Sequence, residues 1–177
     1  MPHRLQAIQK IPSGITEVWE FFSNPEKLKE ITPPHLDFRI LSIVPGKQDP
    51  SADAKHGPVE PWKPDSAIRV KLETGLLIRY NIRPVLNIRL LWETEIAVVM
   101  DGESFTDVQK KGPYRLWHHQ HLFREIPGGT EMTDIVDYEI PFGFLGRIVG
   151  WLLIHRDIRR IFEFREKKIS EIFGNWQ

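Results

Sequence analysis

The chain has 177 residues, an apolar fraction of 41% and equal numbers of basic and acidic residues, 24 of each. This length suits one domain, residues 1–177, with a substantial core, and the balanced charge provides no global field to attract a nucleic acid or an anionic membrane. The absence of cysteine excludes disulfides, thiolate metal sites and thiol nucleophiles, which fits a cytoplasmic protein. No apolar run of about 18 residues is present, so we expect no stable membrane insertion.

The N-terminal part of the chain predicts one strand followed by two short helices. Residues 3–11 alternate loosely in polarity, as in a strand. Ser13 is a candidate N-cap for a helix over residues 15–22, where apolar side chains recur at helical spacing. Asn24 followed by Pro25 is typical of the start of a second helix.

Beyond these helices the period changes to two, which predicts antiparallel strands. The first of these strands is expected in residues 36–44, and a long proline-rich loop follows at about 45–67. The remaining candidate strands are residues 67–75, 75–83, 88–99, 103–109, 114–123 and 130–140. Pro84 and Asn87 mark one of the turns between them, and glycine-containing turns separate the last four strands. The helical period then returns and predicts one long helix from Leu145 to about Phe173.

This order of elements is an α+β plan. We expect a curved antiparallel sheet of about six or seven strands, wrapped around the long C-terminal helix, with two short helices after the first strand. A sheet and a helix of this size need not touch along their whole length, so a cavity between them is expected.

Alternation places one face of three successive strands toward the interior. The polar side chains of this face are Asp107, Gln109, His119, His121 and Asp134. Its apolar and aromatic side chains are Phe105, Trp117, Phe123, Met132 and Tyr138. Facing residues of neighbouring strands lie about 5 Å apart, so hydrogen bonds between aspartate and histidine are expected across the strands.

Three interpretations of this cluster remain open. The aspartate and histidine side chains can satisfy one another inside an imperfectly apolar core. They can instead orient a small apolar molecule in a cavity. In the third interpretation, His119 or His121 is a general base that Asp107 or Asp134 orients.

A metal site receives little support from this sequence. Two histidines at i and i+2 with a carboxylate suit zinc or non-haem iron, but no third ligand occurs at a diagnostic spacing. We therefore expect no metal and no cofactor.

Other elements contribute to the expected site. Tyr80 and Trp92 from the earlier strands and Leu152 from the long helix are expected to line the cavity. Basic residues of that helix, among them Arg165, are interleaved with acidic residues. This pattern is typical of salt bridges on an exposed helix face.

The sequence resembles the START-like helix-grip superfamily, also called SRPBCC, which includes polyketide cyclases and dehydrases and lipid-transfer domains. Within it, the chain is most similar to small, uncharacterised bacterial proteins of the ligand-binding type. The segments that carry the resemblance are VWEFFSNPEKLKEITPPHLDFRIL, WETEI, SFTDVQKKGPYRLWHHQHLF, GGTEMTDIVDYEIPFGFLG and IFEFREKKI. The proline-rich loop departs from the family pattern. The resemblance implies a helix-grip fold with a cavity between the sheet and the C-terminal helix, and it transfers no catalytic motif.

These observations predict binding or transport of a small, largely apolar molecule, such as a lipid, an isoprenoid or a polyketide-like compound. The alternative is a cofactor-free cyclase or dehydratase that uses a His/Asp pair on a polyketide-like substrate. A third option is a regulatory or interaction module with a filled core. The expected partner is a small ligand and not a nucleic acid, and a homodimer is left open.

Overall fold

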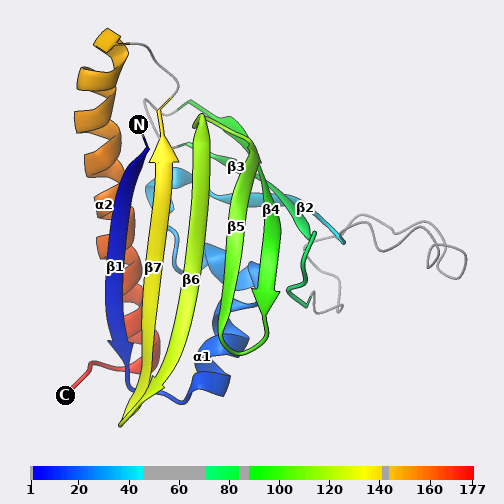
Figure 1. Cartoon of the computed structure of the whole chain (residues 1–177), viewed down its shortest axis with the longest axis vertical. Helices are drawn as coiled ribbons and strands as arrows, with labels where there is room; N and C mark the ends of the chain where they lie inside the picture. Colours follow the sequence, from blue (N-terminus) through cyan, green and yellow to red (C-terminus); the bar gives the residue numbers. More distant parts are fainter. Residues whose placement is uncertain (1, 46–70, 84–87, 141–143) are drawn as a thin grey trace, which may run out of the picture.

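The computed structural model describes residues 2–45, 71–83, 88–140 and 144–177, and of residues 144–153 it describes the backbone alone. In chain order the elements of these ranges are β1 (His3–Ile11), α1 (Ile15–Phe22), the 3₁₀ helices η1 (Pro25–Lys29) and η2 (Pro34–Leu36), β2 (Arg39–Val44), β3 (Leu77–Ile82), β4 (Leu90–Met100), β5 (Ser104–Lys111), β6 (Leu116–Ile126), β7 (Gly129–Glu139) and α2 (Phe144–Phe173) (Figure 1).

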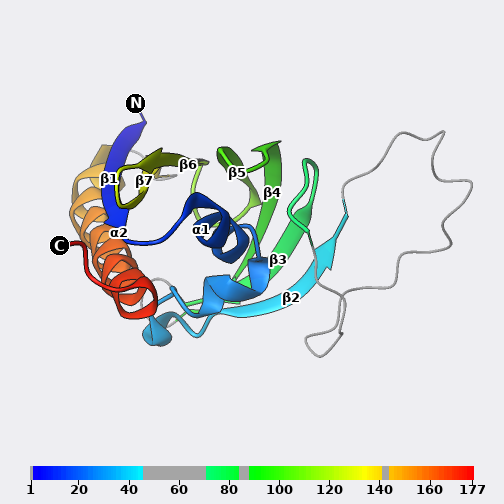
Figure 2. The same ribbon diagram turned by 90° about the horizontal axis from the view of Figure 1, so that it is seen from below.

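The strands form a seven-stranded antiparallel sheet in the order β1-β7-β6-β5-β4-β3-β2. Register shifts in β2 and β4 interrupt the pairing, and such bulges bend a sheet. Figure 2 shows the result: the sheet curves around α1, while α2 runs beside β1 at one end of the sheet. The α+β plan with a curved antiparallel sheet and a long C-terminal helix is therefore confirmed.

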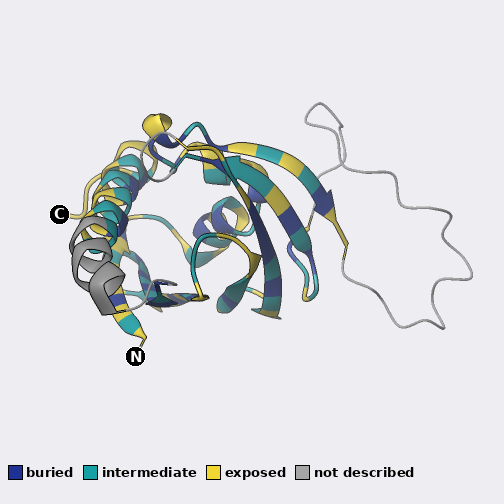
Figure 3. Cartoon of the chain, turned by 90° about the horizontal axis from the view of Figure 1, so that it is seen from above, coloured by how far each residue is buried: buried dark blue, intermediate teal, exposed yellow. Residues whose placement is uncertain are grey.

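Alternation along the strands builds the core. In β7 every second residue is buried, from Thr130 to Tyr138, and Met132, Val136 and Tyr138 are among them, as predicted from the sequence. Figure 3 shows buried and more exposed residues alternating along the strands. The main core cluster joins this inner face to α1, to Ile31 after η1 and to the end of α2. Full burial of one large apolar side chain contributes about 1.5–3 kcal/mol, so this face fixes the register strongly.

The connection from β1 to the sheet follows the predicted helices with two differences. Pro25 occupies the first turn of η1, and the Asn24 side chain accepts a hydrogen bond from the Glu26 backbone N–H, as the sequence indicated. This second helix is a short 3₁₀ helix. Ser13 is not the N-cap of α1, because Gly14 takes that position and the Ser13 hydroxyl donates to the Glu17 carboxylate instead.

The segment before β3 corrects one predicted strand. Residues 71–75 do not form a strand, and residues 67–70 lie outside the described residues, as does the proline-rich loop beyond Pro45. A turn ends at Gly75, whose φ of 90° few other residues adopt, and its N–H donates to the Ile96 carbonyl at 2.7 Å. The chain therefore begins pairing only from Leu77 onward. Among the described helices, none combines the length and apolarity needed to cross a membrane.

Candidate functional site

Three neighbouring strands bring four titratable side chains together on the inner face of the sheet. The register sets Asp107 of β5 opposite His119 of β6, and it sets His121 of β6 opposite Asp134 of β7. His119, His121 and Asp134 are buried, and the Asp107 side chain is only 15% exposed. The His121 ring stacks on Phe105 with 4.1 Å between the ring centroids. The predicted strand phase therefore produces a compact group.

Each imidazole lies between the two carboxylates. His119 Nε2 donates to Asp134 Oδ1 at 2.8 Å, and His119 Nδ1 is 3.4 Å from Asp107 Oδ2. His121 Nε2 donates to Asp107 Oδ2 at 3.0 Å. His121 Nδ1 lies 2.8 Å from Asp134 Oδ1 but is not aligned for a hydrogen bond. The two rings are adjacent, with their centroids 3.8 Å apart.

A cation from the C-terminal helix completes the group. Arg165 of α2 is 9% exposed, and its Nη1 lies 3.7 Å from Asp134 Oδ1. Its guanidinium also lies over the Phe22 ring, 5.5 Å from the centroid. The expectation that Arg165 belongs to an exposed salt-bridge face is therefore wrong. We call Asp107, His119, His121, Asp134 and Arg165 the polar cluster.

Burial and neighbouring charges set the protonation of the polar cluster. Burial raises the pKa of Asp134, but Arg165 and the two imidazoles outweigh burial and hold it well below its usual value. Burial also opposes ionisation of Asp107, yet the hydrogen bond from His121 and the nearby cations lower its pKa. Both carboxyl groups are therefore ionised at neutral pH.

The two imidazoles differ from each other. Burial and the charge of His121 lower the pKa of His119. Burial lowers the pKa of His121 too, but Asp134 and Asp107 reverse this effect and raise it above the usual value. With His121 protonated and His119 neutral, two anions face two cations, so the buried group carries no net charge.

The polar cluster forms one wall of a cavity of about 130 Å³ between the sheet and the α1–η1 segment. We call it the inner cavity. Asp107, His119, His121 and Arg165 supply charge, and Tyr80 and Thr94 supply hydroxyl groups that lie 3.3 Å apart. Most of the other walls are apolar and come from Phe21, Phe22, Pro25, Leu28, Ile31, Leu72, Ile78, Ile96, Phe105 and Trp117.

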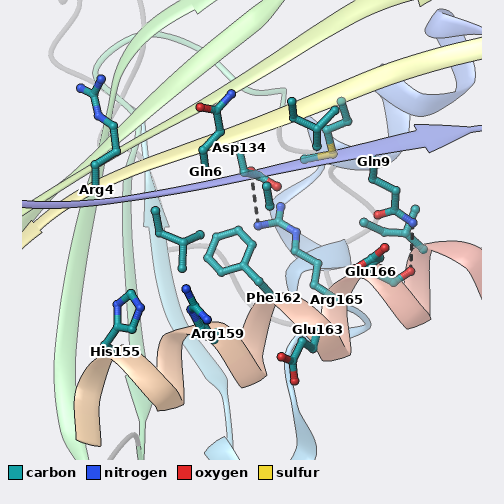
Figure 4. A pocket seen from close by; sticks show the side chains of 15 residues that line it. Arg4, Gln6, Gln9, Asp134, His155, Arg159, Phe162, Glu163, Arg165 and Glu166 are labelled. Carbon is teal, nitrogen blue, oxygen red and sulfur yellow. Dashed lines mark hydrogen bonds and ion pairs between the residues drawn. The ribbon is translucent and has the colours of Figure 1, made fainter. Parts of the chain in front are cut away.

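A second cavity, of about 370 Å³, lies between β1 and α2 (Figure 4). We call it the edge cavity. Its lining is about half polar, and its charged and polar side chains include Arg4 and Gln6 from β1 and Arg159 and Glu163 from α2. Asp134 and Arg165 form its inner end, and their ion pair is drawn in Figure 4. Arg165 lines both cavities, so the polar cluster lies between them.

The structure brings many of the predicted site residues to these two cavities. Those that line the inner cavity are Tyr80, Phe105, Asp107, Trp117, His119 and His121. Met132 and Asp134 line the edge cavity. The inner cavity also has walls that the sequence did not predict, from η1 and from Thr94.

Four of the other predicted site residues, Trp92, Gln109, Phe123 and Tyr138, line neither cavity. The Gln109 amide donates to the Tyr114 carbonyl and accepts from the Tyr114 N–H, so it holds the turn between β5 and β6. Trp92 and Phe123 pack in the core. Tyr138 is hydrogen-bonded through its hydroxyl to His155 Nδ1 at 2.7 Å. The side chain of Leu152 lies outside the described residues.

Arg165 is the residue of this site that the sequence analysis missed, although a signal exists. It lies four residues before Ile169 and three after Phe162, both of which belong to the predicted apolar stripe of the long helix. A cation in phase with an apolar stripe is directed toward the core, where a buried anion is expected to face it.

The arrangement also offers ligands to a metal ion. Asp107, His119 and His121 each supply one donor atom, and these atoms lie within 4.8 Å of one another. Two imidazoles and one carboxylate are a donor set that suits zinc and non-haem iron.

The sheet curves around a short helix and is closed at one end by a long C-terminal helix. This arrangement defines a helix-grip protein, and its charged cluster borders an interior cavity. The solved structures that it resembles share this fold. A START superfamily protein from Mycobacterium smegmatis superposes with a TM-score of 0.62 at 9% identity, over 96% of this chain and 99% of that chain. A protein from Chromobacterium violaceum gives 0.63 at 10% identity, over 99% and 100%. Ara h 8.0201 gives 0.58 at 9% identity, over 98% of each chain.

The chain therefore has a START-like, SRPBCC-type fold, and identities this low show the fold alone. No protein-family model matches the sequence, and no curated protein matches it either.

Proposed function

We propose that the protein binds a small, largely apolar molecule of the lipid, isoprenoid or polyketide type in the inner cavity. The observation that carries this proposal is the polar cluster, which forms one charged wall of an otherwise mostly apolar cavity. Apolar walls with a few convergent polar groups are typical of small-molecule sites, in which the polar groups fix orientation. The START-like fold of the structural neighbours supports the same proposal.

The size of the inner cavity limits what enters it. Its volume of about 130 Å³ is near that of an engineered cavity of about 150 Å³ that holds benzene. One ring or a short branched chain therefore fits without rearrangement. A longer ligand requires the side chains of Leu28, in η1, and Ile31, two residues after it, to move, since both lie on the cavity wall.

The polar cluster defines the chemistry of the bound end. Arg165, together with His121 in its protonated form, which its raised pKa favours, attracts a ligand oxygen with partial negative charge, such as a carbonyl or a phenol oxygen. Asp107 can accept a hydrogen bond from a ligand hydroxyl. We therefore expect an oxygenated ring or chain end to face the cluster, with the apolar part directed toward α1 and η1.

Binding of indole, 1-naphthol and octanoic acid tests this proposal. Each is titrated into metal-free protein, and binding is followed by calorimetry and by the amide resonances of the cavity residues. Leu28→Trp adds a large ring to the cavity wall and should weaken binding at least tenfold. The matched control is Leu41→Trp, because Leu41 is 47% exposed and lines neither cavity. Binding that is equal in the two variants would contradict the proposal, as would no binding of any probe to the wild type.

One observation favours a second candidate function, base catalysis by His119. Its imidazole lines the inner cavity, and its lowered pKa keeps it neutral near neutral pH, as a general base requires. A cofactor-free cyclase or dehydratase would use this base on a polyketide-like substrate. His119→Gln should then abolish turnover of a diketide or triketide model substrate while its dissociation constant changes less than tenfold, and joint loss of binding and turnover would contradict a catalytic role.

A further inference from the structure

Three donor atoms of the polar cluster converge on its Asp107 side. Asp107 Oδ2 lies 3.0 Å from His121 Nε2 and 3.4 Å from His119 Nδ1. Two ligand atoms that are each about 2.1 Å from a tetrahedral ion lie about 3.4 Å apart. These two separations are close to the spacing of atoms around one metal ion, and all three donor atoms lie within 4.8 Å of one another.

The other side of the cluster provides the partner that such ligands need. A histidine that binds a metal usually donates its second ring N–H to a carboxylate, which fixes the tautomer and the ring orientation. The second nitrogens here are His119 Nε2 and His121 Nδ1, and both lie 2.8 Å from Asp134 Oδ1. Asp134 is in turn held by Arg165 at 3.7 Å. A single anchored carboxylate can therefore direct both imidazole lone pairs toward Asp107.

Charge balance favours a cation at this position. With both imidazoles neutral, Asp107 and Asp134 carry two negative charges against the single positive charge of Arg165. The Asp134 side chain is 7% exposed and the Arg165 side chain 10% exposed, so a net negative charge here is costly. A proton between Asp107 and the two rings makes the group neutral, and a divalent metal ion reverses its net charge to +1, which a hydroxide or an anionic ligand bound to the ion would balance.

The three ligand residues also border open space. Asp107, His119 and His121 all line the inner cavity, whereas Asp134 does not. Sites with three protein ligands and an open position are the pattern by which metals bind water or substrate. The sequence argued against a metal because it showed no third ligand at a diagnostic spacing, and the strand register supplies that ligand as Asp107.

We propose that Asp107, His119 and His121 form a binding site for one divalent transition-metal ion, zinc or iron(II), and that Asp134 orients both imidazoles, as the hydrogen-bond acceptor of His119 Nε2 and through its charge beside His121 Nδ1. Arg165 is a positioning residue that acts through Asp134. The site goes beyond the proposed binding of an apolar molecule and does not depend on it, because the metal is titrated without that molecule and the apolar probes are titrated without metal.

Cobalt(II) is the test ion, because it replaces zinc and its visible absorption reports coordination by nitrogen and oxygen. Tag-free protein is stripped with a chelator, dialysed and titrated with cobalt(II), then with zinc. We expect one equivalent of cobalt(II), a visible spectrum of low-symmetry four- or five-coordination, and its loss on addition of one equivalent of zinc. X-ray absorption of the zinc form should show two imidazole ligands.

Matched variants locate the ion. Asp107→Asn should weaken cobalt(II) binding at least a hundredfold, and Asp134→Asn should weaken it ten- to a hundredfold, as loss of an outer acceptor usually does. The controls are His118→Gln on β6, the strand of both histidine ligands, and Asp137→Asn on β7, the strand of Asp134. Their side chains lie on the other face of the sheet. Circular dichroism verifies that each variant is folded.

Three results would overturn the proposal: a wild type that binds no cobalt(II) or zinc, an Asp107→Asn variant that is folded and binds as tightly as the wild type, or controls that lose binding equally. Should Asp107→Asn not fold, the X-ray absorption of the wild type decides, since a zinc site without two imidazole ligands contradicts the assignment. None of these results changes the outcome of the titrations with indole, 1-naphthol and octanoic acid. The proposed metal site and the proposed binding of an apolar molecule can therefore be refuted independently.

Discussion

Replacing Arg165 with methionine removes the cation that faces Asp134 and keeps most of the side-chain volume. The charge centres are represented by Nη1 and Oδ1, 3.7 Å apart. At this distance and an effective dielectric constant of about 20, the attraction is about 4 kcal/mol. Part of this is offset, because the buried guanidinium no longer has to lose its hydration and Arg165 Nε has no hydrogen-bond partner among the described residues. We expect Arg165→Met to lower the free energy of unfolding by about 2–3 kcal/mol at neutral pH.

Urea denaturation followed by tryptophan fluorescence measures this change, since the chain has six tryptophans. The control is Arg4→Met, which removes an exposed arginine paired to Asp137 at 2.7 Å and should have a much smaller effect. A double-mutant cycle combines Arg165→Met with Asp134→Asn. The double variant should be more stable than the sum of the single changes predicts, because the carboxylate is then no longer left without its cation. Additive effects, or an Arg165→Met variant as stable as wild type, would refute the charge balance assigned to the polar cluster.

Three further predictions concern acid stability, a turn glycine and metal removal. In the metal-free protein the pKa of Asp134 is depressed by folding, so this group stabilises the fold above its unfolded-state pKa of about 3.9, and the stabilisation is lost as the pH falls through the folded-state pKa. Asp134→Asn should therefore lose less stability than the wild type below about pH 4. An unchanged dependence of the free energy of unfolding on pH in this range would contradict the assignment. A Cβ on Gly129 would lie 2.1 Å from the Ile11 carbonyl oxygen, so Gly129→Ala should lower the free energy of unfolding by at least about 2 kcal/mol. The control is Gly14→Ala, which should leave it nearly unchanged in the same urea assay, because no atom lies within 4 Å of the added Cβ. If the metal site exists, zinc at about 100 times its dissociation constant should raise the free energy of unfolding by about 2.7 kcal/mol, and a chelator should reverse this in thermal denaturation; a melting temperature that does not respond to zinc would contradict it.

The faces of the strands could be predicted from the sequence because alternation depends only on the local backbone. The pattern around Trp117 and Tyr138 therefore placed His119, His121 and Asp134 inside, where the structure has them. The pairing partners could not be predicted, because register depends on how many residues enter each turn. Only the structure shows that each imidazole lies between both carboxylates.

Two residues show where local reasoning ends. Gln109 has the predicted phase, but it lies near the end of β5, and its amide satisfies the backbone of Tyr114 in the following turn. Arg165 has the sequence environment of an exposed salt-bridge residue, with acidic neighbours on the same helix. Its burial depends on which face of α2 packs against the sheet. The charge pattern does not indicate that face, whereas the apolar residues Phe162 and Ile169 at helical spacing from Arg165 do. The cavity volumes likewise depend on side-chain packing between elements that are far apart in the sequence.

The remaining question is whether the polar cluster exists for stability or for binding, and apolar replacement decides it. Buried charge networks cost much of their attraction in lost hydration, and well-packed apolar residues of similar volume are often neutral or more stable by about 1–4 kcal/mol. We therefore make the fivefold variant with the replacements Asp107→Leu, His119→Phe, His121→Phe, Asp134→Leu and Arg165→Met. If the cluster serves binding, this variant should be at least as stable as the wild type in urea, yet it should lose both cobalt(II) and the oriented binding of 1-naphthol. A folded variant that is less stable by several kcal/mol would instead show that the aspartates and histidines hold the core together, and the first of the three interpretations of the cluster would then be sufficient.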